Sequence, residues 1–231
     1  YYNFSFVYKI KLSSKAKFFF KKLLPSILSS GVTQINILVG TIIASFEASA
    51  VSYLYYADRI YQINLALAGI AVGTVSLPVL SKAFKQKNIS KISNIQNRSI
   101  ELSLLLSIPA SLGLIIASEQ IVSALFGYGS FTKENINMTA SALEYFGYGL
   151  PAFALIKILS NFFFARNNTK IPFYISTFIV LLNISISISF FNKIGFIIIP
   201  IATSFSTWIG IVFYLFFLNN RNFLLIKSYL I

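Results

Sequence analysis

The chain is a succession of long apolar runs separated by short polar segments. A helix of about 20 apolar residues crosses the ~30 Å hydrocarbon core of a bilayer, and six runs are long enough to do so. They extend over residues 23–44, 53–80, 100–117, 140–164, 171–191 and 194–218. The pattern therefore predicts an all-α protein: a polytopic membrane bundle of six transmembrane helices.

One segment of the fifth run departs from this pattern. From Asn183 to Ser189, isoleucine alternates with polar residues, a period of two that is typical of a strand. In lipid, however, a lone strand leaves its backbone groups without partners, whereas serine hydroxyls in a helix can bond to carbonyls of the preceding turn. We therefore predict that this segment is helical.

Charge is distributed unevenly among the segments that separate the runs. The net charge is +13, and fifteen of the nineteen basic residues lie before the first run, between runs two and three, between runs four and five, or after run six. The positive-inside rule then predicts that both chain ends are cytoplasmic. A nucleic-acid patch would have no reason to alternate with hydrophobic runs, so no nucleic-acid partner is expected, whereas the basic segments suit anionic membrane lipids.

These boundaries divide the chain into three parts. We expect residues 1–22 to form a basic cytoplasmic segment, 23–218 a six-helix transmembrane lobe, and 219–231 a cytoplasmic tail or the start of a linker to further helices. The chain has one methionine, which is not at position 1, so we expect it to be a piece of a longer polypeptide.

Composition narrows the chemistry. Hydrophobic residues make up 56% of the chain and charged residues 11%, and there is no cysteine or histidine. Disulfides, thiol chemistry, imidazole bases and most transition-metal sites are thereby excluded. No span holds a carboxylate pair, a nucleophile elbow or a phosphate-cradling loop. The sequence therefore predicts neither an enzyme nor a bound cofactor.

The most informative charges are Asp58 and Arg59, at the start of the apolar stretch 60–80. A charge at the centre of a membrane helix costs roughly 2.5–3.5 kcal/mol, and such residues usually face a bundle interior or a wet cavity. Steps of three and four residues from Arg59 predict one small or polar face: Gln62, Ala66, Gly69, Gly73 and Ser76. The opposite face is apolar: Ile60, Ile63, Leu67, Ile70 and Leu77. Either this pair lines a cavity, or it marks the membrane interface by snorkelling into headgroups.

Two other spans carry polar content. In the first, one face carries small and polar residues and Gln34 lies on its flank; the face consists of Ser26, Ser29, Thr33, Asn36, Gly40 and Ala44 and ends at Glu47. That face is either a cavity wall or a surface for close helix packing. In the fourth span, Lys157 lies on a face with Glu144 and Asn161. It either enters the cavity or snorkels to the interface near Arg166.

Several ordered motifs resemble the bacterial lipid II flippases of the MurJ (MviN) family. The runs YYADR at 55–59, AGIAVGT at 68–74 and LPVLS at 77–81 are similar to the family's eighth-helix region. QIN at 34–36 is similar to the preceding helix, FGYGSFT at 126–132 to an outer loop segment, and FARNNTKIP at 164–172 to the end of the tenth helix and its following loop. Together these motifs cover roughly residues 20–220.

The resemblance implies a two-lobe fold of the multidrug/oligosaccharidyl-lipid/polysaccharide exporter superfamily, with this chain as the second lobe. It implies translocation of lipid II, a lipid-linked peptidoglycan precursor, across the bacterial inner membrane by alternating access. The N-terminal lobe would then be a partner that completes the central cavity. Arg59 would engage the diphosphate of this anionic substrate, Asp58 would orient Arg59 or face water, and Lys157 matches a basic position of the tenth helix.

The resemblance leaves two matters open. Some relatives are described with a sodium site built from the seventh, eleventh and twelfth helices, to which Asn183 and Thr203 would belong here. The last two spans contain no carboxylate, so the metal assignment stays unknown. The alternatives for function are a superfamily transporter of another substrate and a non-transporting remnant of a flippase gene.

Overall fold

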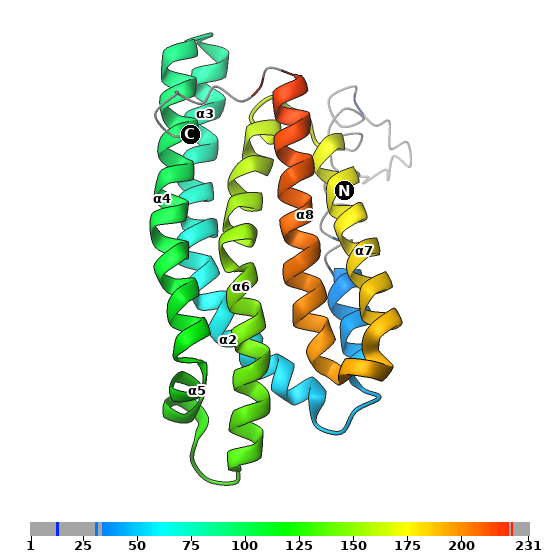
Figure 1. Ribbon diagram of the computed structural model, residues 1–231. Coiled ribbons are helices and arrows are strands. Elements are labelled where there is room, and N and C mark those ends of the chain that lie inside the picture. The colour runs from blue at the N-terminus through cyan, green and yellow to red at the C-terminus, as the bar shows by residue number, and fades with distance from the viewer. Residues whose placement is uncertain (1–12, 14–30, 32–33, 222, 224–231) are drawn as a thin grey trace, which may run out of the picture.

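The computed structural model describes residues 13, 31, 34–221 and 223, and all structural statements below concern these residues. They fold as a bundle of helices without strands in the described part (Figure 1). After a short apolar helix, Gln34–Ala44, the elements follow in chain order. They are α2 (Ala50–Leu65), η1 (Ala66–Ala71), α3 (Val72–Lys85), α4 (Ile89–Ile116), α5 (Ser118–Phe126), α6 (Lys133–Phe164), α7 (Lys170–Ile194), η2 (Gly195–Ile197) and α8 (Ile198–Asn220).

The all-α membrane architecture is confirmed. Four helical stretches are long and apolar enough to cross a membrane: Ala50–Lys85, Ile89–Ile116, Lys133–Phe164 and Lys170–Asn220. The last of these folds back on itself as α7 and α8, which run in opposite directions (Figure 1). Because only part of the first predicted span lies among the described residues, the count of six spans is approximate.

Local signals set the ends of the helices. The Asn88 side chain caps α4 by accepting a 2.9 Å hydrogen bond from the Lys91 amide, and Thr132 caps α6 in the same way. The α7–α8 reversal uses Gly195 at φ 75°, a left-handed conformation that favours glycine. Residues 183–189 lie within α7, where the Ser185 hydroxyl donates to the Leu181 carbonyl at 2.8 Å. The prediction of a helix there is confirmed.

Helix α2 continues into α3 through a π-helical segment, η1. Here six residues, Ala66–Ala71, form a wider turn than the α-helices on either side. Gly69 lies in this segment and packs closely on α6, because a Cβ built there would be 3.0 Å from the Ala154 Cα. Asn161 of α6 also binds across, donating a 2.8 Å hydrogen bond to the Gly73 carbonyl. The bent helix is therefore fixed against α6 at and beyond its irregular turn.

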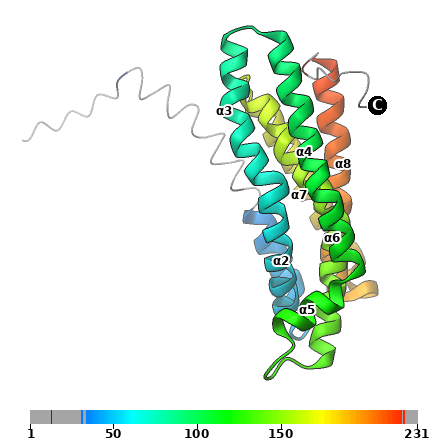
Figure 2. The same ribbon diagram turned by 90° about the vertical axis from the view of Figure 1, so that its left-hand side faces the viewer.

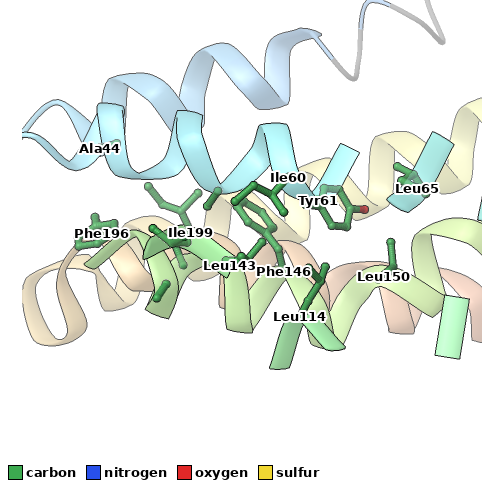
Figure 3. Packing of buried hydrophobic residues seen from close by; sticks show 14 of the residues in the cluster. Ala44, Ile60, Tyr61, Leu65, Leu114, Leu143, Phe146, Leu150, Phe196 and Ile199 are labelled. Carbon is green, nitrogen blue, oxygen red and sulfur yellow. The ribbon is translucent and has the colours of Figure 1, made fainter. Parts of the chain in front are cut away.

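Helix α6 lies between α4 and α8 and carries much of the core (Figure 1). One apolar cluster joins it to α2 and the α7–α8 turn. In this cluster the Tyr61 ring stacks on the Phe146 ring, and Phe196 and Ile199 are further members (Figure 3). A second cluster, around Phe162 and Phe163, joins α6 to α3, α7 and α8. Both clusters lie inside the bundle, while many large apolar side chains remain exposed on its outside, as expected for a surface that faces lipid.

Arg166 holds several elements together at one end of the bundle. The α3–α4 turn, the α6–α7 connection and the end of α8 lie together at one end (Figure 1). There the Arg166 guanidinium lies 4.1 Å from the ring centroids of both Phe84 and Phe223, and it donates hydrogen bonds to the carbonyls of Phe162 and Phe223. Burial lowers the pKa of Arg166 to about 10, so it remains charged at neutral pH. Arg166 thus joins α3, α6 and the residue beyond α8.

Candidate functional site

Asp58 and Arg59 are neighbours on α2, but their side chains have different surroundings. Asp58 is half-buried, accepts a hydrogen bond from the Gln62 amide, and lines a cavity of about 210 Å³. Arg59 is exposed, and its guanidinium carbon lies 4.6 Å from the centroid of the Tyr55 ring. A ring face attracts a cation at this distance. Asp58 therefore belongs to the interior of the lobe, and Arg59 to its surface.

The cavity lies where five helices meet. Its lining comes from the helix Gln34–Ala44, α2, α6, α7 and α8, and its polar members are Asn36, Thr41, Asp58, Asn183 and Thr203. Gly40 and Ala44 also line it, so the described members of the first-span face form a cavity wall. Ser26, Ser29 and Thr33, which share that predicted face, lie outside the described residues.

The predicted small and polar face of residues 59–76 has different surroundings along the helix. Arg59, Gln62 and Ala66 are exposed, whereas Gly69, Gly73 and Ser76 are buried. The π-helical segment η1 interrupts the regular α-helical spacing within this stretch. On the opposite face, Ile63, Leu67 and Ile70 are exposed as predicted, whereas Ile60 is buried in the core.

Asn183 and Thr203 face each other across α7 and α8. The Asn183 amide donates a 2.9 Å hydrogen bond to the Thr203 hydroxyl, which in turn donates to the Ile199 carbonyl at 2.6 Å. The side-chain oxygen of Asn183, Oδ1, accepts a hydrogen bond from the Ser187 hydroxyl at 3.1 Å. These bonds join the two helices with neutral groups.

This arrangement offers few carboxylate ligands to a sodium ion. The one carboxylate that lines the cavity is Asp58 of α2, which accepts a hydrogen bond from Gln62, and the described residues hold no group of three His, Cys, Asp or Glu side chains that could bind a metal ion. Hard cations need several free oxygen ligands and benefit from carboxylates. Two of the neutral oxygen-bearing residues of this cavity, Asn183 and Thr203, bond to each other instead.

The other candidates lie apart from this cavity. Lys157 is exposed on α6, one turn before Asn161, and Gln34 is exposed at the start of the first described helix. Neither residue lines the cavity, and neither does Arg59. The structure thus brings together Asp58 and Asn36 and leaves the other three candidates on the outer surface of this lobe.

Tyr55 is the site residue that the sequence reasoning did not single out. It lines the cavity and also lies under the Arg59 guanidinium. Tyr55 lies four residues before Arg59 in the sequence, and side chains at this spacing are neighbours on a helix, so the sequence already indicated a contact between the two. Tyr55 therefore connects the buried and exposed halves of the candidate site.

Comparison with known proteins identifies the family. The sequence model for "Lipid II flippase MurJ" matches residues 3–230. A probable lipid II flippase MurJ of Rhizobium meliloti is 42% identical over 187 residues, covering 81% of this chain and 35% of that protein. Its counterpart in Rickettsia prowazekii is 40% identical, over 81% of this chain and 38% of that protein. The chain thus spans little more than a third of these relatives.

Solved structures agree. A lipid II flippase MurJ in an inward closed conformation matches with a TM-score of 0.79 and 31% identity, over 93% of this chain and 47% of that one. An outward-facing multidrug resistance transporter of the MATE family matches with a TM-score of 0.76 but 16% identity, which shows a shared fold alone. By sequence and by structure, the chain is a multi-pass membrane protein that belongs to the lipid II flippase MurJ family.

Proposed function

We propose that this chain is one lobe of a flippase that moves lipid II, the lipid-linked peptidoglycan precursor, across the bacterial inner membrane. The family membership supports this proposal, because the relatives are named probable lipid II flippases. Since the chain matches little more than a third of each relative, the substrate path requires an N-terminal lobe as partner. The function is transport of an anionic lipid-linked substrate rather than catalysis.

The observation that carries the proposal is the environment of Arg59. Its guanidinium is exposed on a membrane helix, where it lies over the Tyr55 ring and next to the charge of Asp58 and makes no hydrogen bond or salt bridge among the described residues. The adjacent carboxylate, Asp58, is directed into the lobe and bonded to Gln62. The charge of Arg59 therefore stays available to a ligand, and the planar guanidinium fork makes paired, charge-assisted hydrogen bonds to phosphate oxygens.

The remaining candidates have supporting roles in this proposal. Lys157 is a second exposed cation for the anionic substrate, and Gln34 is an exposed amide on the first described helix. Asn36 and Asp58 line the interior cavity beside the Arg59 helix, where Asp58 fixes Gln62 one turn further along. Together they hold the α2 surface in position while Arg59 and Lys157 contact substrate.

Translocation proceeds by alternating access, in which the two lobes rock around a central anionic site. Both chain ends are cytoplasmic in this proposal. The end of the bundle that carries the α3–α4 turn also holds Lys82, Lys85, Arg166 and Lys170, whereas the opposite end carries Glu47, Glu119 and Glu134 together with only Lys133 and Lys193 as bases. A basic end of this kind is the cytoplasmic one under the positive-inside rule.

Complementation of flippase loss tests the proposal. In the full-length protein that carries this chain, Arg59→Ala is expected to abolish growth, because a charged hydrogen bond contributes ~1.5–3 kcal/mol and no other described cation is adjacent. Arg59→Lys should rescue poorly, since an ammonium lacks the planar fork. Arg221→Ala, at an exposed cation of the basic end, is the matched control and should grow normally. Normal growth of Arg59→Ala at equal protein levels would refute the role of Arg59.

A further inference from the structure

A groove runs along the outside of the α3–α4 pair, apart from the candidate site. It has a volume of about 490 Å³ and lies between η1 and α3 on one side and α4 on the other. The two helices run side by side in opposite directions, joined by a short turn (Figure 2). Val75 is 71% exposed and Leu102 is 41% exposed, so the groove is open to the outside, and most of its lining is apolar.

The groove has one polar end and one apolar end. Because the helices are antiparallel around the turn at residues 86–88, Val79 and Asn94 lie at the end near the turn, and Leu67 and Leu106 at the far end. These two ends of the groove are twelve residues apart along each of its two walls, η1–α3 and α4, or ~18 Å at 1.5 Å per residue. That length is close to the hydrocarbon of a single leaflet, half of ~30 Å.

The polar end carries a free cation. Arg98 lines the groove, is exposed, and makes no hydrogen bond or ion pair within the part of the chain that the structure describes. The end of α3 adds Lys82 and Lys85 nearby. Glu101 is the single acidic side chain of α3 and α4; it lines a neighbouring groove, which Arg98 also borders, and it is not part of the lining of this one. The polar end is therefore net positive.

We propose that this groove binds an anionic phospholipid of the leaflet at the basic end of the bundle, with its phosphate on Arg98 and one acyl chain between α3 and α4. The charge of the head matches Arg98, and the eight residues from Arg98 to Leu106 give the acyl chain ~12 Å of groove, most of the ~15 Å hydrocarbon of one leaflet. Anionic lipids are concentrated in cytoplasmic leaflets, where basic side chains attract them. This lipid is a resident of the outer surface of the lobe and is distinct from the substrate that Arg59 contacts.

Native mass spectrometry of the full-length protein in detergent, titrated with phosphatidylglycerol and separately with phosphatidylcholine, tests the site. Wild type should hold phosphatidylglycerol in preference to phosphatidylcholine. Arg98→Gln should bind phosphatidylglycerol roughly tenfold more weakly, as expected for loss of a charged hydrogen bond, and Arg98→Lys should recover part of the affinity. Val75→Trp should also weaken binding, because it fills the exposed groove without changing the charge.

Lys170→Gln is the matched control, an exposed cation at the same end of the bundle and outside the groove. It should leave phosphatidylglycerol affinity at the wild-type value. Equal affinity in wild type and Arg98→Gln would overturn the proposal, as would an equal loss in Lys170→Gln, which would indicate unspecific attraction. A photo-crosslinker at Leu102 should label lipid; exclusive crosslinks to another part of the protein would show that protein covers the groove and would also overturn it.

Discussion

Replacing Arg166 with alanine removes a clamp at the basic end of the bundle. The guanidinium donates hydrogen bonds of 2.8 Å to the Phe162 carbonyl and 2.7 Å to the Phe223 carbonyl. It also lies 4.1 Å from the ring centroids of Phe84 and Phe223. Gln96 of α4 donates to the same Phe223 carbonyl at 2.9 Å. The substitution therefore weakens contacts among α3, α4, α6 and the residue beyond α8.

The magnitude follows from these contacts. Hydrogen bonds to a charged donor contribute ~1.5–3 kcal/mol each and cation–π contacts at exposed sites ~0.5–1 kcal/mol each. Because Arg166 is only about half buried, the lower values apply, and Arg166→Ala should cost ~2–4 kcal/mol in all. For a chain of this size each kcal/mol lowers Tm by ~2–4 °C, which predicts a drop of ~4–16 °C. Arg166→Lys keeps the charge but loses the fork, so it should fall between wild type and alanine.

Thermal unfolding in detergent, followed by intrinsic fluorescence, measures this effect. The control is Arg221→Ala, an exposed arginine at the same end, which should change stability by less than ~0.5 kcal/mol. Phe84→Ala should cost less in the Arg166→Ala background than in wild type, because the two side chains share a contact, although its packing on the apolar core is lost in both. An Arg166→Ala protein that unfolds within a degree of wild type would refute the reasoning, as would equal losses in Arg166→Ala and Arg221→Ala.

Three further predictions concern packing and the helix junction. Gly69→Ala should lower thermal stability by ~1–3 kcal/mol because its Cβ would lie 3.0 Å from the Ala154 backbone, whereas Gly113→Ala, with open space around it, should not destabilise. Asn183→Ala should cost ~0.6–1.7 kcal/mol in the same unfolding assay through loss of the Thr203 bond, and an unchanged Tm would contradict that bond. Replacing sodium with choline should leave the transport rate of the full-length protein unchanged, because Asn183 and Thr203 bond to each other and the one carboxylate of the cavity, Asp58, is bonded to Gln62. A strong loss of rate would show a functional sodium site.

Much of the fold was predictable because each membrane span is a long run of apolar residues that can be recognised in the sequence. The predicted run 140–164 corresponds to α6, and 171–191 to α7, each within a few residues at the C-terminal end. Helix α4 instead begins at Ile89, eleven residues before the predicted run. Its first turns carry Lys91, Arg98 and other polar residues, and hydropathy cannot distinguish a polar helix end from a loop. The nine-residue helix α5 was missed because it is too short to span lipid.

The candidate site was predictable in residue identity but not in orientation. The cost of burying charge in lipid singles out Asp58 and Arg59 without any structure. That Asp58 lines the cavity while Arg59 is exposed depends on how α2 is rotated against α6, and long-range packing sets that rotation. The π turn of η1 has no signature in the periodicity, and Ile60, which was predicted on the apolar outer face, is buried in the core. Local patterns identified the residues, and tertiary contacts decided which of them meet.

The most direct test of the proposed function is the affinity of the purified full-length protein for lipid II. Arg59→Gln should bind ~10–100-fold more weakly than wild type, in keeping with the loss of one or two charge-assisted phosphate contacts. Arg98→Gln, on the outer groove, should bind lipid II as wild type does. Equal lipid II affinity in wild type and Arg59→Gln would contradict the assignment of Arg59 as the phosphate-binding residue of this lobe.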